Sequence, residues 1–283
     1  ASYRRQRQMC IRDSSYLLCF SNLGKLHWLK VHRIPEMSRT ARGRPIVQLL
    51  QMAKDEQVMN ILPVKEFVSG HSVLLATKMG LIKKVDLMAF SNIRSNGIIA
   101  IGINDGDELM GAALISEGDD VFLATHQGRS IRFSEKDVRE MGRSARGVKG
   151  IQLSDGDYVV GMSTIRPDDE KDGYSLLSVT EKGYGKRTKI GEYRQQGRGG
   201  SGIINIKVSD KNGPLVSVRK VCSQDDVIII SDVGQLIRTN VEAISEIGRS
   251  TQGVRVIRID NEESVKAFAV VREEVEEDDK TVH

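Results

Sequence analysis

The sequence has little of what catalytic, metal-binding and membrane-spanning proteins depend on. Only 5% of its 283 residues are aromatic, and there is a single tryptophan. No apolar run approaches the roughly 20 residues needed to cross a bilayer, so we expect no membrane span. The three cysteines, Cys10, Cys19 and Cys222, show neither metal-ligand spacing nor an even disulfide framework. Free thiols of this kind are typical of a reducing cytosol.

Motifs for catalysis are missing as well. The five histidines are scattered, without a His-x-x-x-His pair, and no phosphate-cradling Gly-x-x-x-x-Gly-Lys motif occurs. Asp155 and Asp157 belong to a turn sequence rather than to a cluster of metal ligands. The tyrosines lie on predicted strands or loops, without a neighbour that would activate a nucleophile. We therefore predict no catalytic and no metal site.

Glycine, by contrast, marks five copies of one pattern. The copies centre on glycines 56, 48, 55 and 51 residues apart: Gly24, Gly80, Gly128, Gly183 and Gly234. An arginine follows each glycine by 14 or 15 residues, at Arg39, Arg94, Arg143, Arg198 and Arg249. A period near fifty residues indicates a propeller, solenoid or array whose units bury their cores against their neighbours.

The third copy predicts the local structure of a repeat. Residues 120–125 have a strand pattern, residues 126–129 supply a glycine turn, and residues 130–133 return as the partner strand. Residues 147–153 and 158–165 have the pattern of a third and a fourth strand. Four strands in about fifty residues match one propeller blade, so we expect an all-β fold.

We expect three regions along the chain. Residues 1–15 lie outside the pattern and are predicted to be a non-native lead, residues 16–272 hold the repeats, and residues 273–283 form an acidic tail. The repeats are assigned to residues 16–67, 72–118, 120–173, 174–225 and 226–272. Because the lead does not fit, we also expect that the native chain extends further upstream and that the first blade is incomplete.

The charge is unevenly distributed. Residues 273–279 carry six of the 38 acidic groups, and the rest of the chain has 42 basic against 32 acidic groups, a balance of +10. A basic body favours a polyanionic partner, and an acidic tail commonly competes for the same surface. We expect the tail to weaken binding at low salt; the alternative is an inert, solvated tail.

Basic residues also recur in register. Four residues after the turn glycine, four copies have a cation, and the first has Trp28. These cations are Lys84, Arg132, Arg187 and Arg238. Together with the loop arginines they predict a basic band, which suits a phosphate backbone because such binding depends on summed charge. The alternative is that they occupy ordinary outward strand positions.

Three segments resemble a known family. Gly43–Val47, Gly183–Thr188 and Gly248–Val254 are similar to the C-terminal domain of bacterial DNA gyrase A, and the resemblance covers about residues 16–280. It implies a β-pinwheel, a propeller-like ring of about five to six blades that exchanges strands between blades and wraps DNA around a basic rim. The predicted DNA-binding residues are Arg39, Arg42, Arg44, Lys84, Arg94, Arg132, Arg143, Arg146, Lys149, Lys186, Arg187, Arg198, Arg238 and Arg249.

The resemblance also implies a larger enzyme. In the family, the DNA-cleaving tyrosine belongs to an N-terminal domain, and the ATPase belongs to a different polypeptide. The resemblance therefore implies that this chain needs no cofactor. ATP and magnesium are expected for the whole type II topoisomerase. The implied partners are double-stranded DNA, the N-terminal cleavage domain and gyrase B, in the bacterial cytoplasm at the nucleoid. The family's upstream box, Gln-Arg-Arg-Gly-Gly-Lys-Gly, is missing; Gln196–Gly202 is similar but lies in the fourth repeat.

Two other functions fit the same pattern. The homologous domain of topoisomerase IV, which favours decatenation, shares the repeats, although the Gly183–Thr188 loop favours gyrase. A propeller-like scaffold for protein partners would need apolar or mixed patches on its rim, where this sequence repeats lysine and arginine. Duplex binding that weakens with salt would separate DNA binding from a scaffold role.

Overall fold

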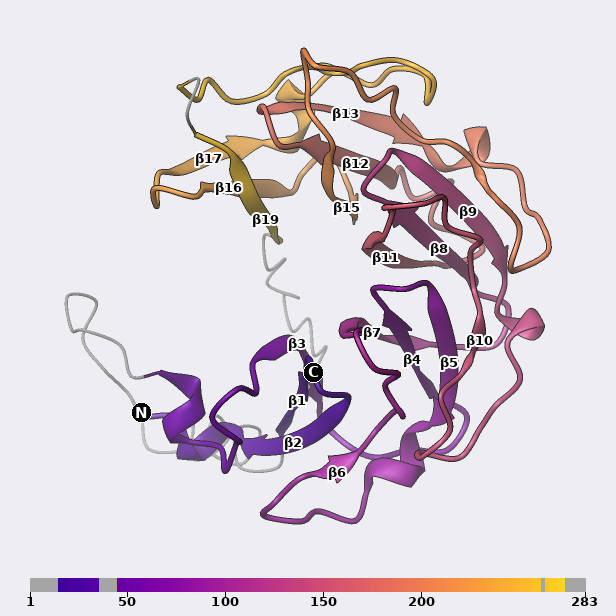
Figure 1. Ribbon diagram of the computed structural model, residues 1–283, viewed down its shortest axis with the longest axis vertical. Coiled ribbons are helices and arrows are strands. Elements are labelled where there is room, and N and C mark those ends of the chain that lie inside the picture. The colour runs from indigo at the N-terminus through magenta and orange to yellow at the C-terminus, as the bar shows by residue number, and fades with distance from the viewer. Residues whose placement is uncertain (1–14, 36–44, 261–262, 273–283) are drawn as a thin grey trace, which may run out of the picture. The chain divides into compact units, whose positions relative to one another are not determined.

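The repeats fold into small antiparallel sheets joined by tight turns. The computed structural model describes residues 15–35, 45–260 and 263–272 (Figure 1). Its strands are β1 (Tyr16–Ser21), β2 (Lys25–Lys30), β3 (Val58–Val64), β4 (Ser72–Thr77), β5 (Leu81–Asp86), β6 (Ile98–Ile99), β7 (Leu109–Ile115), β8 (Asp120–Thr125), β9 (Arg129–Ser134), β10 (Val148–Lys149), β11 (Val159–Ile165), β12 (Ser175–Thr180), β13 (Tyr184–Lys189), β14 (Ile203–Ile204), β15 (Leu215–Val221), β16 (Asp226–Ser231), β17 (Leu236–Asn240), β18 (Val254–Arg255) and β19 (Val265–Val271).

Helical structure is confined to short 3-10 turns in these described ranges. They are η1 (Val31–Arg33), η2 (Ile46–Gln48), η3 (Leu87–Phe90), η4 (Glu135–Asp137), η5 (Ile190–Glu192) and η6 (Val241–Ala243). The predicted all-β fold is therefore confirmed. The predicted hairpin of the third repeat is present as β8 and β9, in which Phe122 lies opposite Arg132.

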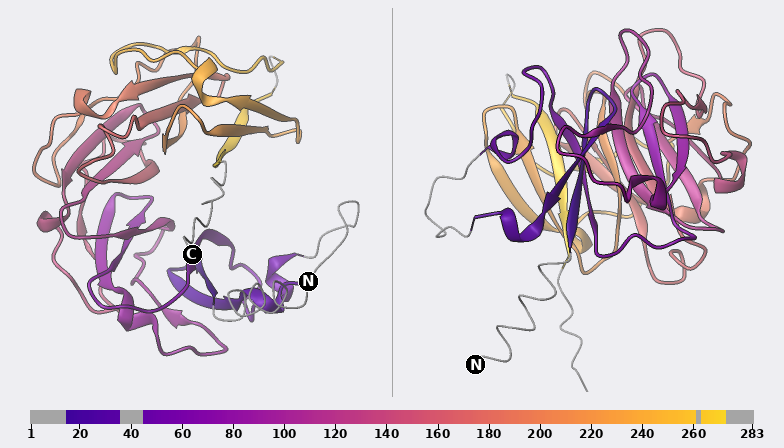
Figure 2. Two further views of the ribbon diagram at one scale, coloured as in Figure 1. Left: turned by 180° about the vertical axis from the view of Figure 1, so that it is seen from behind. Right: turned by 90° about the horizontal axis from the view of Figure 1, so that it is seen from below.

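The chain divides into two compact units. Unit 1 comprises residues 1–125, 130–167 and 195–202, and unit 2 comprises residues 126–129, 168–194 and 203–283. In unit 1 the strand orders are β3-β1-β2-β6, β10-β5-β4-β7 and β11-β8-β9; in unit 2 they are β15-β12-β13-β18 and β17-β16-β19. The hairpins of each unit can be followed from two further sides in Figure 2.

The outermost strand of a sheet is supplied by the following repeat. The two-residue strands β6, β10 and β18 pair with β2, β5 and β13 of the repeat before them. This corrects the expectation that residues 147–153 form a third strand of their own blade, since only Val148 and Lys149 are extended and they complete the preceding sheet. A strand pattern in the sequence does not reveal which neighbour the strand will pair with.

The prediction of an incomplete first blade is wrong for the same reason. The sheet around β1 has four strands, whereas the sheet around β16 has three among the described residues. Because the fourth strand comes from the following repeat, the first sheet is completed by β6 of the second repeat. The predicted lead and the acidic tail lie almost wholly outside the described residues.

The inner strands are buried on both faces, which explains their continuous apolar sequences. In β4, Val73 and Leu75 join one hydrophobic cluster, while Leu74 and Ala76 join the next. Successive side chains of a strand point to opposite faces, so one strand contributes to two cores. Aliphatic side chains do most of this packing, consistent with the low aromatic content.

The turn glycine is the point at which successive repeats join. The carbonyl oxygen of Gly80 accepts hydrogen bonds from the amides of Gly150, at 2.8 Å, and Ile151, at 3.4 Å. The same pair of bonds recurs at Gly24 with Ala100 and Ile101, at Gly128 with Asn205 and Ile206, and at Gly183 with Val256 and Ile257. The second donor is always a buried isoleucine, which we call the anchor isoleucine.

A Cβ atom at Gly24, Gly128 or Gly183 would overlap the carbonyl oxygen of the anchor isoleucine. Gly183 has φ of +75°, and a Cβ atom there would lie 2.6 Å from the carbonyl oxygen of Ile257. Gly234 occupies the same turn in the fifth repeat with φ of +84°, but no described atom would lie within 4 Å of its Cβ. The two glycines therefore share a backbone requirement and differ in the contact with a following repeat.

Replacing Gly183 by alanine should destabilise unit 2 more than the same change at Gly234. Both substitutions place alanine at positive φ, which costs about 1–2 kcal/mol. Only Gly183→Ala adds the overlap with Ile257, so we expect about 1–2 kcal/mol beyond the loss at Gly234, as for other steric conflicts in packed structure. Urea unfolding of the two variants measures the difference. Equal losses would show that the close approach of the exchanged segment contributes no steric constraint.

Two lysines are among the largest fully buried side chains. Lys83 on β5 and Lys186 on β13 are both 0% exposed. Burial lowers the pKa of Lys83 to about 8, with a further contribution from the charge of Arg143. Burial lowers the pKa of Lys186 to about 7, where Glu192 raises it and Arg249 lowers it by their charges. An unperturbed lysine has a pKa near 10.4, so both groups favour the neutral amine more than they would in water.

Lys186 should give unit 2 a pH-dependent stability that a methionine at this position lacks. Between the folded pKa of about 7 and the ordinary value of 10.5, the unfolded chain binds a proton that the folded chain does not. The free energy of unfolding should therefore rise with pH in this window, relative to Lys186→Met, by at most ~1.4 kcal/mol per pH unit. Urea unfolding of both proteins at about pH 6 and about pH 9 tests this. A difference that stays constant over that range would contradict it.

Candidate nucleic-acid interface

Three of the recurrent arginines, Arg143, Arg198 and Arg249, lie on loops that begin at a bridge to a strand of the preceding repeat. In unit 1, a parallel bridge joins Glu140 to Lys84 before the loop, and β10 pairs with β5 after it. Arg143 lies between these two attachments. In unit 2, a bridge between Glu246 and Arg187 precedes Arg249, and β18 follows it. We call these segments and that of Arg94 arginine loops, at residues 91–97, 141–147, 196–202 and 247–253.

Three of the arginine loops also accept a hydrogen bond from the residue that follows an anchor isoleucine. In unit 1, the amide of Gly102 donates to the carbonyl of Ala145 at 3.0 Å, and the amide of Gln152 donates to the carbonyl of Gly200 at 2.9 Å. In unit 2, Lys207 donates in the same way to Thr251 at 2.9 Å. Each donor directly follows an anchor isoleucine, and each acceptor lies two residues after an arginine. The bonds therefore place consecutive arginines in one register.

Arg94 and Arg143 line the same hollow of unit 1. Its volume is about 350 Å³, and Gly97, Ile98, Ile99 and Ser144 complete its walls. Arg94 is exposed and Arg143 is half-buried. Among the described residues, neither guanidinium has a hydrogen bond or an ion pair, so both are available to an external anion. A phosphate group matches the planar fork of hydrogen-bond donors that a guanidinium presents.

Three further predicted cations of unit 1 lie on the neighbouring loops. Arg146 and Lys149 are exposed, and the Lys149 ammonium donates to the side-chain oxygen of Gln152 at 2.7 Å. Arg198 is exposed but donates to two carbonyl oxygens, of Asp137 at 2.8 Å and of Lys149 at 3.0 Å. The structure therefore brings Arg94, Arg143, Arg146, Lys149 and Arg198 together along linked loops of one unit.

Unit 2 contains one arginine loop with the same kind of backbone contact. Arg249 lies on the loop that Lys207 contacts, and its Nη1 donates to the carbonyl oxygen of Ile204 at 2.9 Å. The amide of Arg249 donates to the Glu192 carboxylate at 3.0 Å. Two terminal N–H groups on Nη2 have no protein acceptor in the described part of the chain, so the guanidinium retains donors for an anion.

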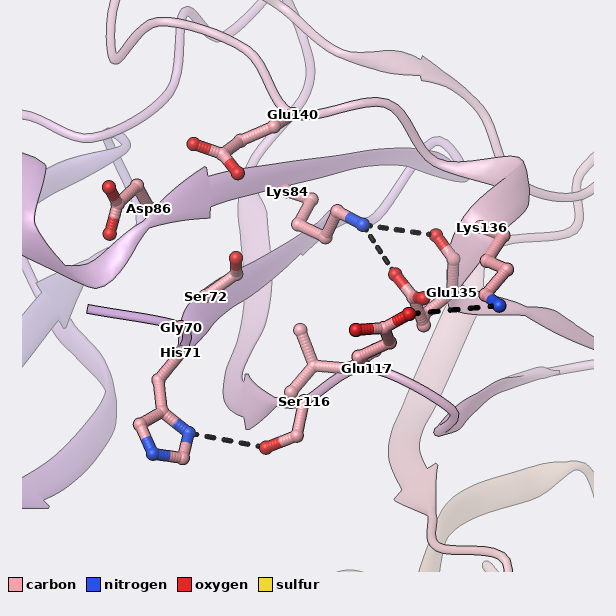
Figure 3. Close-up of a pocket in the computed structure, with 11 residues that line it drawn as sticks. Gly70, His71, Ser72, Lys84, Asp86, Ser116, Glu117, Glu135, Lys136 and Glu140 are labelled. Carbon is pink, nitrogen blue, oxygen red and sulfur yellow. Dashed lines mark hydrogen bonds and ion pairs between the residues drawn. The ribbon is translucent and has the colours of Figure 1, made fainter. Parts of the chain in front are cut away.

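The strand cations are held by acceptors of the chain itself. The ammonium of Lys84 is paired with the Glu135 carboxylate in a hollow of unit 1 (Figure 3). Arg132 pairs with Asp120 at 2.8 Å, and Arg238 pairs with Asp226 at 2.6 Å. Arg187 donates from Nε to the carbonyl oxygen of Ile244 at 2.7 Å. Their charges are thus partly balanced within each unit.

One predicted contact is wrong, and three lie outside the described residues. Lys186 is fully buried, and its ammonium faces backbone oxygens of the arginine loop, so it cannot touch a phosphate. Arg39, Arg42 and Arg44 fall in residues 36–44, which the structure does not describe.

A cluster around Tyr184 in unit 2 is missing from the predicted set. The Nη2 atom of Arg255 donates to the Tyr184 hydroxyl oxygen at 3.1 Å, and the Lys211 ammonium lies 5.6 Å from the centre of the ring. The hydrogen bond from Arg255 and the two nearby cations lower the pKa of Tyr184. Lys182 lines the same hollow, whose walls also include the carboxylates of Asp260 and Glu263. The only signal in the sequence is Gly-Tyr-Gly, because Lys211 and Arg255 are distant along the chain.

Other kinds of site find no support in the described ranges. No group of three histidine, cysteine or acidic side chains is arranged to hold a metal ion. None of the helical turns described is long and apolar enough to cross a membrane. The arginine loops are therefore the strongest candidate for a binding surface.

Comparison with known proteins agrees with this architecture. The family model described as DNA gyrase C-terminal domain, beta-propeller, matches residues 15–65, 71–116, 119–166, 174–222 and 225–272. DNA gyrase A of Salmonella typhimurium strain LT2 is 46% identical over 263 residues, which cover 93% of this chain and 29% of that protein. DNA gyrase A of Escherichia coli strain K12 is 42% identical over 273 residues, 96% of this chain and 31% of that protein. The chain thus spans less than a third of the length of these relatives.

Two solved structures share the fold. A DNA gyrase A C-terminal domain matches with a TM-score of 0.78 and 27% identity, covering 92% of this chain and 83% of the other. The C-terminal domain of a DNA topoisomerase IV matches with a TM-score of 0.82 and 24% identity, covering 92% and 80%; at this identity the likeness concerns the fold alone. The five matched segments span most of the sequence, and the chain belongs to the DNA gyrase C-terminal domain family of β-propellers.

Proposed function

We propose that this chain binds duplex DNA along its arginine loops and bends it for a DNA gyrase. The observation that carries the proposal is a pair of hydrogen bonds, from Gly102 to Ala145 and from Gln152 to Gly200. Each bond joins one arginine loop to the segment that follows the preceding arginine loop. These bonds hold Arg94, Arg143 and Arg198 in line along unit 1. A line of cations at a fixed repeat follows a phosphate backbone and needs no base contact, so binding should tolerate any sequence.

The DNA can be bent because its phosphate contacts are distributed along the line of arginine loops. Bending 20–30 bp by 40–90° costs of order 1–6 kcal/mol, and many phosphate contacts along the path can offset this cost. In the whole enzyme, a type II topoisomerase driven by ATP, the bent segment would be presented to an N-terminal cleavage domain and to gyrase B. Passage of the resulting crossing would introduce negative supercoils. The residues described contribute binding to this process and no chemical step.

We expect the strand cations to contribute less to DNA binding than the loop arginines do. Lys84, Arg132 and Arg238 each have a carboxylate partner, so a phosphate must compete with an existing ion pair. Arg94 and Arg143 face no such competition in the described part of the chain. The same reasoning applies to the domain of topoisomerase IV as an alternative identity, since both would use the fold to hold DNA.

Alanine at Arg94, Arg143 and Arg198 together should weaken duplex binding and reduce its salt dependence. Each lost phosphate contact lowers the slope of log K against log salt by about 0.9, so the triple variant should lose about 2–3 in slope. Fluorescence anisotropy with a labelled duplex at several KCl concentrations measures this. The matched control replaces Lys54, Lys136 and Lys171, three exposed lysines outside the loops, and should change the slope by less than one contact. Equal slopes for the two variants would place the DNA elsewhere.

A variant of the strand cations provides a second comparison of salt dependence. The sequence alone predicts that Arg132→Ala, Arg187→Ala and Arg238→Ala together remove two to three contacts. Because Arg132 and Arg238 already pair with carboxylates, we expect a smaller loss than for the loop variant, whose arginines have no carboxylate partner among the described residues. A larger loss of salt slope in this variant than in the loop variant would show that the strand cations make more phosphate contacts than the loop arginines.

Bound DNA should be wrapped rather than merely held. Nicked plasmid ligated in the presence of the chain, without ATP, should retain a change in linking number that grows with protein concentration. The loop variant should retain less at equal occupancy. A chain that saturates the plasmid and leaves the linking number unchanged binds without wrapping, which would favour a scaffold role.

A further inference from the structure

One position of the repeat packs directly beneath the arginine loops. It lies three residues after the turn glycine and points inward. The five repeats have different residues there: His27, Lys83, Ile131, Lys186 and Ile237. All but Ile237 are buried, and Ile131 indicates that this buried position does not need a charge for folding.

In the second repeat, the lysine at this position is bonded to the arginine loop of the next repeat. The Lys83 ammonium donates to the carbonyl oxygens of Arg143 at 2.5 Å, Ala145 at 3.0 Å and Ala100 at 2.8 Å. An ammonium has three donors, and all three are used. Ala100 belongs to the segment that follows the Arg94 loop, so one buried group joins that segment to the Arg143 loop.

The fourth repeat reproduces this arrangement in unit 2. The Lys186 ammonium donates to the carbonyl oxygens of Gly248 at 2.7 Å and Arg249 at 2.5 Å, and to the Thr251 hydroxyl at 3.3 Å. In both units the carbonyl of the recurrent arginine is an acceptor. Fixing this carbonyl fixes the peptide plane from which the arginine side chain projects.

The third repeat shows what happens without the lysine. Ile131 replaces it, and the next arginine, Arg198, binds the carbonyls of Asp137 and Lys149 with its own guanidinium. Arg143, whose loop is held by Lys83, makes no such bond in the described residues. Arg249, whose loop is held by Lys186, still donates to the carbonyl of Ile204. The guanidinium without such a bond is therefore particular to Arg143, whereas support of the loop backbone by a buried lysine is common to both loops.

We propose that Lys83 and Lys186 are positioning residues, which hold the loops of Arg143 and Arg249 in the geometry that binds phosphate. This rests on the proposed DNA-binding function. The lysines do not touch DNA; they act through the backbone of the arginine that does.

The test replaces each lysine by methionine, which keeps the unbranched stem and removes the ammonium. Hydrogen exchange is measured by mass spectrometry on peptides covering residues 141–147 and 247–253. Lys83→Met should accelerate exchange at least tenfold in the first peptide and leave the second unchanged, and Lys186→Met should do the reverse. Each variant is thus the control for the other. Lys220→Met, which removes an ammonium paired with Asp169 in unit 2, should leave both peptides unchanged.

DNA binding supplies the readout that a purely structural role would not give. Lys83→Met should lower the salt slope by about one contact, as Arg143→Ala does, and the double variant should lose no more than Arg143→Ala alone. Lys186 and Arg249 should behave in the same way. Unchanged exchange in both peptides, or additive losses in the double variants, would overturn the proposal.

The two proposals can fail separately. If Arg143→Ala leaves the salt slope unchanged, the phosphate contact at this loop is wrong, while the exchange measurement still decides whether Lys83 holds the loop. If one methionine variant does not fold by circular dichroism, the other lies in a different unit and is tested independently. Apolar Ile131 at the equivalent position indicates that both should fold.

Discussion

The structure depends on one backbone interaction, the capture of two consecutive amides by the carbonyl of a turn glycine. Gly80 accepts from Gly150 and Ile151, and the other joining glycines accept from the corresponding residues. Positive φ turns this carbonyl toward the next repeat, and the missing Cβ lets the exchanged segment approach to contact distance. The buried anchor isoleucine adds apolar contact to the two bonds. A sheet is therefore complete only when the following repeat has folded against it, as in other repeat proteins.

This constraint also explains the regular spacing of the arginines. The distance along the chain from each arginine to its anchor isoleucine is seven residues in the first loop, Arg94 to Ile101, and eight in the others. The other pairs are Arg143 and Ile151, Arg198 and Ile206, and Arg249 and Ile257. In the loops of Arg143, Arg198 and Arg249, the anchor fixes one end and a bridge to the preceding strand fixes the other. The number of residues between these two points therefore sets where the arginine projects.

Local features of the fold could be predicted from the sequence because they depend on adjacent residues. The β8–β9 hairpin follows from an alternating apolar strand and the turn at Gly128. The partner of β10 could not be predicted, because a two-residue strand has no pattern of its own and its pairing with Ile82 and Leu81 is a contact between repeats. The all-β class and the repeats were therefore predictable, and the exchange of strands came only from the family resemblance.

The candidate site was predictable to a similar extent. The loop arginines follow from their constant spacing, but Lys186 stands in a polar motif that predicts an exposed cation. Its acceptors at Gly248 and Arg249 are more than 60 residues away in the sequence, so nothing local reveals the burial. A usable signal is present in the register. Lys83 and Lys186 occupy the position of Ile131, and an apolar residue in one repeat predicts an inward position in all of them.

The division of the basic residues into three environments changes how the charge of the chain should be interpreted. Net charge counts Lys186, Arg132 and Arg143 alike, yet the first is buried against carbonyl oxygens, the second is paired with Asp120, and the third has no ion-pair partner in the described part of the chain. Counterion release depends on cations that can approach a phosphate. The buried lysines do not contribute to that number directly, and the paired strand cations contribute less than their charge. We therefore expect the strength of the proposed interface to depend on the loop arginines and on the backbone bonds that align them.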